Sequence, residues 1–202
     1  YSALLKMPSF WERFKKWSHV LIYQTDALIM RKIDDLYFDY DYIGAPWKNL
    51  NDWLGNNKPK YNGGNGGFSL RKVSSMLSIC EIHRGIPMEI IDGSNEDAFF
   101  CSFNLKYPSG DVHKKFSVEE IFHPFPIGGH QLYRYLSDEQ FIHIINHIES
   151  QFKLQETNNV LVFTLFGGIN GVGFYNQIFS LELAIYMSNF FKRKLYLRIE
   201  QP

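Results

Sequence analysis

Four short segments of this chain contain side chains that bind metals or phosphate or that transfer protons. They lie at residues 24–26, 63–71, 96–97 and 122–130. The first, Gln24-Thr25-Asp26, ends an apolar run at residues 20–25 that predicts a buried strand, and open α/β sheets bind ligands at the carboxyl ends of their strands. An Asp there can hold a divalent cation beside a diphosphate, although an Asp at a strand end also commonly starts a turn.

The second segment is rich in glycine. Residues 63–71 read GGNGGFSLR, and glycines allow a backbone to approach a ligand closely. A helix predicted to follow would add free N–H groups for phosphate or sugar hydroxyls. The spacing differs from a dinucleotide fingerprint, and the same residues would also fit a flexible loop that ends at a helix cap.

The third and fourth segments offer a general base and a second metal ligand. Glu96 and Asp97 precede aromatic residues, so burial could tune one of these acids to accept a proton. Their alternative role is to complement the dipole of a helix first turn. His123 and His130 lie among Pro and Gly, where a neutral imidazole could complete a metal site begun by Asp26. A loop histidine more often makes an ordinary hydrogen bond.

Alternating strands and helices would position these residues. Strands are predicted at residues 20–25 and 40–44, the second stopped by Pro46, and a loop at residues 48–67. Four helices are predicted. One follows the capping pattern at Ser9, one runs from Val73 and is closed by Gly85, and one starts at a cap at Ser94. The fourth spans Ser137 to Phe152, with Ser137 as its N-cap.

The tail predicts a second, smaller unit. Residues 153–159 are polar and read as a linker, and residues 160–166 predict a buried strand. A glycine-rich turn, an apolar helix and a second strand at residues 194–199 follow. This order is typical of a parallel α/β sheet, so the whole chain is predicted to be an α/β protein.

The composition excludes some classes of function. Hydrophobic residues make up 45% and charged residues 21% of 202, as in ordinary soluble globular proteins. A net charge of zero argues against binding nucleic acid or an anionic membrane as the main task. Neither a membrane-spanning run nor a signal peptide is visible, so the default location is cytoplasmic. Cys80 and Cys101 are expected to be buried thiols in a reducing compartment, with one structural disulfide as the alternative.

Seven blocks, in order, resemble one family. They are YSALL…FWE, VLIYQTD, IDD, YDYIGAPW, GNGGFSLRK, NEDAFF and FSVEEIFHPFPIGGH, from about Tyr1 to about Leu136. The chain is similar to a family of uncharacterised proteins assigned to the GT-A glycosyltransferase superfamily. The resemblance implies a partial GT-A domain over residues 1–152, a mixed sheet flanked by helices. It also implies sugar transfer from a nucleotide-sugar donor to a carbohydrate or glycoconjugate acceptor with Mn²⁺ or Mg²⁺. Such enzymes open with a strand–helix–strand segment that holds the nucleotide base. Here that segment is expected either to be missing or to lie outside this sequence, before Tyr1.

The resemblance implies roles for individual residues. Asp26 matches the metal-binding end of the superfamily's Asp-X-Asp motif, with Gln24 in place of the first Asp. His130 resembles the late histidine that reaches the metal. Asp97, beside Glu96, resembles the catalytic base of inverting members. Residues implied to line the donor and acceptor pocket are Gln24, Thr25, Trp47, Gly66, Gly67 and Phe68.

The tail resembles a different family. Residues 167–179, within a match of about 160–198, are similar to the first turn of fucosyltransferase-like GT-B domains, where glycines at a helix start meet nucleotide-sugar phosphates. The resemblance implies that residues 160–202 begin a second α/β domain. The alternative is a simple closing strand and helix.

Two other functions stay open. A carbohydrate- or nucleotide-binding module without catalysis is favoured by Gln24 in the metal motif. A metal-dependent phosphohydrolase fits less well, because such sites usually need several carboxylate ligands.

Overall fold

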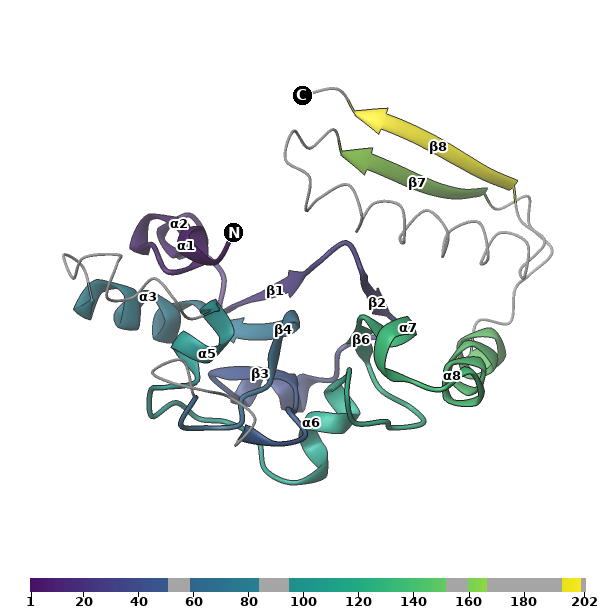
Figure 1. Cartoon of the computed structure of the whole chain (residues 1–202). Coiled ribbons are helices and arrows are strands. Elements are labelled where there is room, and N and C mark those ends of the chain that lie inside the picture. The colour runs from purple at the N-terminus through teal and green to yellow at the C-terminus, as the bar shows by residue number, and fades with distance from the viewer. Residues whose placement is uncertain (51–58, 84–94, 152–159, 167–193, 201–202) are drawn as a thin grey trace. The chain divides into compact units, whose positions relative to one another are not determined.

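The computed structural model of the chain describes residues 1–50, 59–83, 95–151, 160–166 and 194–200 (Figure 1). The chain divides into two compact units, Tyr1–His147 and Ile148–Pro202. Side chains are described up to His147. Within these residues the structure contains no helix long and apolar enough to cross a membrane.

The first unit contains two small sheets. One has the strand order β1-β4-β3 and is antiparallel; the other has the order β2-β6-β5, with β2 antiparallel and β5 parallel to β6. The strands are β1 (His19–Tyr23), β2 (Ala27–Ile29), β3 (Tyr42–Ala45), β4 (Asn65–Lys72), β5 (Ser117–Val118) and β6 (Gly128–His130). The expectation of mixed α/β structure flanked by helices is confirmed, although the strands form two sheets where one was expected.

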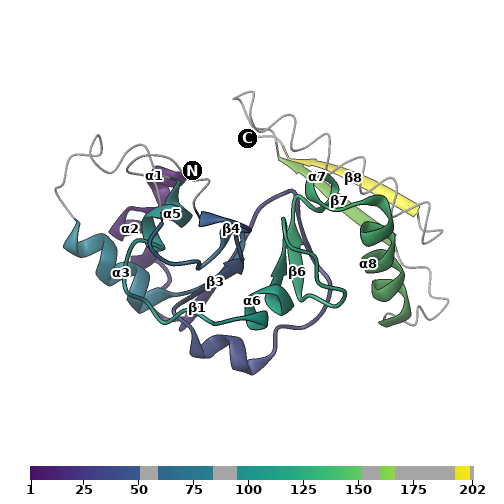
Figure 2. The ribbon, with the colours of Figure 1, turned by 60° about the horizontal axis from the view of Figure 1, so that its bottom comes forward.

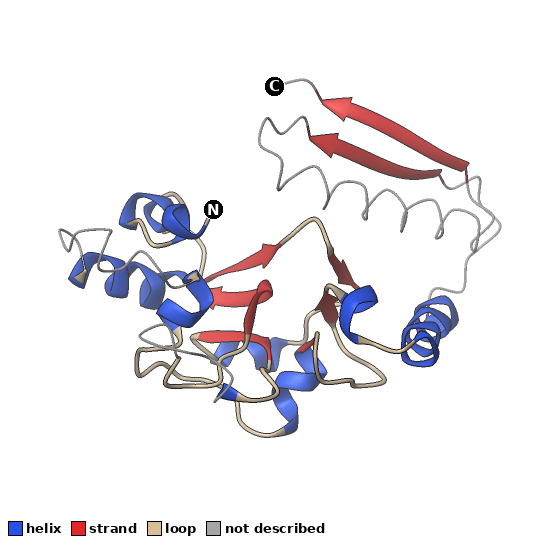
Figure 3. Ribbon diagram, in the orientation of Figure 1, coloured by secondary structure: helices blue, strands red, loops and turns tan. Residues whose placement is uncertain are grey.

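Short helices flank the two sheets of this unit (Figure 3). They are α1 (Ser2–Leu5), α2 (Pro8–Glu12), the 3₁₀ helix η1 (Asp35–Asp39), α3 (Val73–Ile82), α5 (Glu96–Phe100), α6 (Asp111–Phe116), α7 (Leu132–Tyr135) and α8 (Asp138–Gln151). Figure 2 shows α1, α2, α3 and α5 grouped beside β1, β3 and β4, and α7 near β6. Helix α6 packs against β3 and β5.

Alternation along the strands divides the core between the two faces of the first sheet. In β3, Tyr42 packs into a cluster with Trp11 and Phe100, and its neighbour Ile43 packs into a second cluster with Phe68 and Phe116. Cys80 and Cys101 are buried free thiols in the first cluster, as expected.

Several predicted elements are confirmed. Strand β3 ends before Pro46, α3 begins at Val73, and α8 is capped by Ser137, whose hydroxyl accepts a hydrogen bond from the Gln140 N–H at 3.3 Å. In the second unit, β7 (Val160–Phe166) and β8 (Lys194–Glu200) pair in parallel, as their pattern predicted.

Other predictions were wrong in detail. Helix α2 begins at Pro8, before Ser9, because the fixed φ of proline fits a first helical turn. The predicted loop at residues 48–67 runs too far, since Asn65 to Gly67 already belong to β4. The N-cap of α5 is Asn95, and Ser94 lies outside the described residues. Gly85, Phe152 and residues 153–159 and 167–193 also lie outside them, and with them the segment that resembles a GT-B turn.

Candidate functional site

The Gln24–Asp26 turn joins the two sheets. Strand β1 ends at Tyr23, the Gln24 N–H donates to the Gly67 carbonyl of β4 at 2.9 Å, and the Ala27 N–H donates back to the Gln24 carbonyl at 3.0 Å. Strand β2 starts directly after Asp26 and pairs with β6, with Ala27 opposite His130. Backbone pairing therefore brings Asp26 beside a histidine more than one hundred residues later in the chain.

Asp26, His130 and Glu119 form a buried charged cluster in which His130 lies between the two carboxylates. His130 Nε2 lies 3.2 Å from Asp26 Oδ1, and His130 Nδ1 lies 3.0 Å from Glu119 Oε1. The three residues are only 5–8% exposed. Burial alone would lower the pKa of His130, but the close contacts and negative charges of the two carboxylates outweigh it and raise the pKa to about 9. At neutral pH an imidazolium therefore separates two acids.

Each carboxylate of this cluster responds differently to its surroundings. Burial opposes ionisation of Asp26, but the contacts with His130 and with the Gln131 amide lower its pKa below the usual value. Burial raises the pKa of Glu119, and the bond to His130 offsets part of that rise. Asp26 is therefore the more firmly ionised of the two acids.

The facing atoms of Asp26 and His130 fit a divalent cation. Asp26 Oδ1 and His130 Nε2 are buried and form no aligned hydrogen bond with any described residue, although they lie 3.2 Å apart. Neighbouring ligands on an octahedral cation with bonds of about 2.1 Å lie about 3 Å apart. Metal-binding histidines typically donate their other ring N–H to a carboxylate, as Nδ1 does here to Glu119.

The chain would supply few ligands to such a cation. The structure, as far as it is described, contains no group of three His, Cys, Asp or Glu side chains arranged to hold a metal. Two protein ligands suit Mg²⁺ or Mn²⁺, which retain waters and take further oxygens from phosphates. His130 would have to lose its Nε2 proton to bind, so metal and proton compete for that nitrogen.

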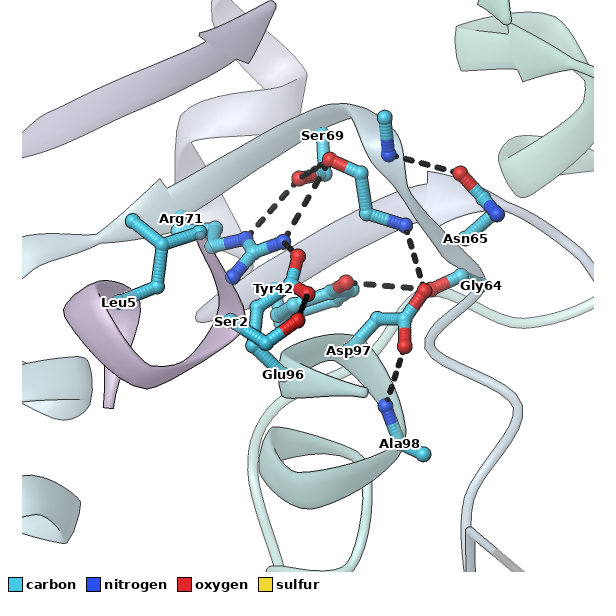
Figure 4. A network of polar contacts seen from close by, with 12 residues as sticks. Ser2, Leu5, Tyr42, Gly64, Asn65, Ser69, Arg71, Glu96, Asp97 and Ala98 are labelled. Carbon is cyan, nitrogen blue, oxygen red and sulfur yellow. Dashed lines mark hydrogen bonds and ion pairs between the residues drawn. The ribbon is translucent and has the colours of Figure 1, made fainter. Parts of the chain in front are cut away.

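A second polar network surrounds Glu96 and Arg71 (Figure 4). Arg71 is fully buried, and one of its terminal nitrogens lies 3.0 Å from Glu96 Oε1. Its Nε donates to the Ser69 hydroxyl at 2.9 Å, and its guanidinium lies 4.8 Å from the Tyr42 ring centroid. The Ser2 hydroxyl donates to the other Glu96 oxygen at 3.2 Å. Glu96 is thus fixed as the partner of a buried cation.

Asp97 lies in the same helix turn, but no basic side chain among the described residues forms an ion pair with it. Its carboxylate accepts hydrogen bonds from the Gly66 N–H at 3.0 Å and the Ala98 N–H at 2.7 Å. Burial and the neighbouring charge of Glu96 raise the pKa of Asp97 to about 6, despite these bonds and the charge of Arg71. A carboxylate with this pKa can accept a proton near neutral pH.

Gly66 and Gly67 connect the two charged groups. A Cβ atom at Gly66 would lie 2.6 Å from a terminal nitrogen of Arg71 and 3.2 Å from the Asp97 Cβ. At Gly67 a Cβ would lie 2.5 Å from His130 Nε2. These contacts leave no space for a side chain at either position, so two consecutive residues of β4 contact both the acid pair and the Asp26–His130 pair.

The remaining predicted pocket residues differ in their exposure. Gln24 is half-buried and Thr25 is exposed at the turn. Trp47 is buried in the first core cluster, and its backbone N–H and carbonyl pair with the Asn62 amide. Phe68 is fully buried in the second cluster, where its ring centroid lies 5.4 Å from that of Phe116. The side chains of Trp47 and Phe68 therefore pack in two different clusters of the hydrophobic core.

Among the histidine candidates, His123 has a separate contact: its Nδ1 accepts a hydrogen bond from the Phe125 N–H at 3.1 Å. This is the ordinary hydrogen-bonding role that was the alternative for a loop histidine.

The sequence analysis did not single out Glu119 or Arg71. Glu119 follows the buried strand β5, and an acid at a strand end is the same signal that identified Asp26. Arg71 is a charged residue inside the otherwise buried run of β4, which signals a paired charge. Both signals are visible in the sequence, but neither predicts which residue the Glu119 or Arg71 side chain contacts.

Comparison with known proteins gives one match. Residues 1–130 match the protein-family profile described as "Protein of unknown function (DUF5672)". No curated protein and no solved structure matches the chain.

Proposed function

The chain belongs to the DUF5672 family, and from the geometry of its site we propose that it is a metal-dependent glycosyltransferase of the GT-A type. It would move a sugar from a nucleotide-sugar donor to an acceptor hydroxyl. The observation that carries the proposal is the convergence at Gly66 and Gly67 of a base candidate, Asp97, and a cation-binding pair, Asp26 and His130. The resemblance of the seven sequence blocks to an uncharacterised family assigned to the GT-A superfamily supports the same proposal.

In the proposed reaction, Asp26 and His130 would hold Mn²⁺ or Mg²⁺, and the bound ion would neutralise the charge of the departing nucleoside diphosphate. The Asp97 carboxylate accepts the proton of the acceptor hydroxyl. The acceptor oxygen then forms a bond to the anomeric carbon as the bond from that carbon to the phosphate oxygen breaks, with inversion. The electron pair of the broken bond leaves with the diphosphate, so charge and atoms balance.

Glu96 has a different role in this proposal. Its charge is taken up by Arg71, so it does not act as the base. It acts on Asp97 through space, because a fixed negative charge beside a buried carboxyl makes ionisation harder and the carboxylate more basic. The neighbouring acids thus divide into one structural anion and one proton acceptor.

A nucleotide-sugar-binding module without catalysis is the second candidate. It is favoured by Gln24 in place of the first motif Asp, and by the two backbone N–H groups that bond to Asp97. In that role the Asp97 carboxylate would link β4 to α5 through its hydrogen bonds and would not contact an acceptor.

A thermal-shift screen of nucleotide-sugars with and without Mn²⁺, followed by an assay for nucleoside diphosphate release, separates the candidates. The transferase should be stabilised by one donor only when Mn²⁺ is present and should hydrolyse it slowly. Stabilisation without release would favour the binding module. With the Asp26→Ala variant, Mn²⁺-dependent release should be lost. Because Asp26 also contacts His130 and Gln131, the metal-free melting temperature should fall, and the release assay is run below the melting temperature of the variant. Unchanged release would remove Asp26 from the mechanism.

A further inference from the structure

Gln131 has a backbone conformation that residues with a side chain rarely adopt. Its φ is 48° and its ψ is 38°, the left-handed region, and no other non-glycine among the described residues has a positive φ. The left-handed region brings Cβ too close to the following carbonyl, so a long side chain is disfavoured there unless its surroundings hold it.

The usual local explanations do not account for this conformation. Gln131 stands at the N-cap position of α7, but its side chain makes no capping bond to that helix. Glycine or asparagine is the usual residue in this region, since asparagine is short enough to bond to its own backbone. The left-handed conformation of Gln131 is therefore best explained by the contacts of its side-chain amide, which extends further than that of asparagine.

Both the backbone and the side chain of Gln131 bind Asp26. The Gln131 N–H donates to the Asp26 carbonyl at 3.1 Å, and Gln131 Nε2 donates to Asp26 Oδ2 at 2.9 Å. On its other side, Gln131 Oε1 accepts a hydrogen bond from Arg134 at 3.3 Å, which fixes the orientation of the amide. With Oδ2 occupied in this way, Oδ1 is the Asp26 oxygen left beside His130 Nε2.

We propose that Gln131 is a positioning residue for the cation, held in the left-handed region so that its amide turns Asp26 Oδ1 toward the same point as His130 Nε2. This inference rests on the proposed function, because it needs a cation between Asp26 and His130. Residues that orient metal ligands change affinity by about 10- to 100-fold when removed. The backbone strain at Gln131 is the cost of that orientation.

The test compares metal affinity with metal-free stability in two variants of the full chain. Gln131→Gly relieves the backbone strain and removes the amide; Gln131→Asn tolerates the left-handed region but is one methylene too short to reach Asp26. Mn²⁺ binding is measured by electron paramagnetic resonance of free Mn²⁺, and stability by thermal unfolding in chelator. Gln140→Ala is the control, because Gln140 pairs with Ser137 at the start of α8.

Both variants should weaken Mn²⁺ binding at least tenfold, while the metal-free melting temperature of Gln131→Gly stays at or above that of the wild type. The control should retain wild-type affinity. Wild-type affinity in both variants, or a loss of metal-free stability with affinity unchanged, would overturn the role of Gln131 and leave the proposed function standing. If the wild-type chain binds no Mn²⁺, Asp26 and His130 do not form a cation site. Both the proposed function and the role of Gln131 would then be wrong.

Discussion

Replacing Asp97 with asparagine should remove most of the pH dependence of folding stability that this site creates between about pH 4 and pH 6. The pKa of Asp97 is raised from an ordinary value of 3.8 to about 6 by burial and by the charge of Glu96. The folded state therefore keeps a proton that the unfolded chain releases. Stability from this group is fully present below the unfolded pKa and is lost as the pH rises through the folded pKa.

The magnitude follows from the size of the shift. A difference of about two pKa units, at 1.36 kcal/mol each, corresponds to a loss of about 3 kcal/mol by pH 7, to order of magnitude. All four tryptophans lie in the first unit, so urea unfolding followed by tryptophan fluorescence reports on the unit that contains Asp97. Measurements at about pH 4, 5, 6 and 7 in chelator give the free energy of unfolding at each pH.

Other groups also titrate, so the quantity to compare is the difference between wild type and Asp97→Asn at each pH. This difference should shift in favour of the variant by up to about 3 kcal/mol as the pH rises across the window. Asp111→Asn is the matched control, since Asp111 is an exposed acid paired with Lys114. If wild type and Asp97→Asn lose stability in parallel, Asp97 has an ordinary pKa and the argument for it as a base fails.

Three further predictions follow from the two charged groups. Glu96→Gln should destabilise the first unit by about 3 kcal/mol, because it leaves the buried Arg71 guanidinium without its counter-charge, and should lower the melting temperature by about 6–12 °C. Gly67→Ala should cost about 1–3 kcal/mol and weaken Mn²⁺ binding, because the new methyl group displaces the His130 ring. Mn²⁺ affinity should rise about tenfold per pH unit between about pH 6 and pH 9, because binding releases the proton from His130, whose pKa is raised to about 9.

Each of these predictions has its own control. Asp34→Asn breaks the exposed pair with Arg31 and should change stability by less than about 1 kcal/mol, so an equal effect from both acids would contradict the Arg71 argument. Gly110→Ala adds a Cβ at a position where nothing lies within 4 Å, but the positive φ of Gly110 strains an alanine there. It therefore controls for a general loss of stability and should leave Mn²⁺ affinity unchanged. Calorimetry in two buffers of different ionisation heat counts the protons released on Mn²⁺ binding. A count of zero below pH 8 would show that His130 is not a ligand.

Much of the fold could be predicted because its signals are local. The apolar runs of β1, β3, β7 and β8, the helical spacing from Val73 and the Ser137 cap each depend on a few neighbouring residues. The extent of β4 could not be predicted in this way. Its first residues are Asn and Gly, which favour a loop, and pairing with the neighbouring strands overrides that preference.

The residues of the candidate site could be proposed from their types, but their contact partners could not be predicted. Asp26, Asp97 and His130 stand out as polar residues in apolar or glycine-rich surroundings. That Arg71 pairs with Glu96 and not with Asp97 depends on how α5 meets β4, which no local pattern encodes. Glu119 and Gln131 owe their roles to β6, because that strand places His130 between two acids and Gln131 beside Asp26.

The central claim is that Asp26 and Asp97 serve one reaction, and a double-mutant cycle on Mn²⁺-dependent nucleoside diphosphate release from the donor tests it directly. Asp97→Asn should lower the rate about 10²- to 10⁴-fold, and Asp26→Asn should abolish its dependence on Mn²⁺. Residues that act in one chemical step are not additive, so the double variant should be no slower than the slower single variant. Wild-type rates in Asp97→Asn, or losses that simply multiply in the double variant, would contradict the account.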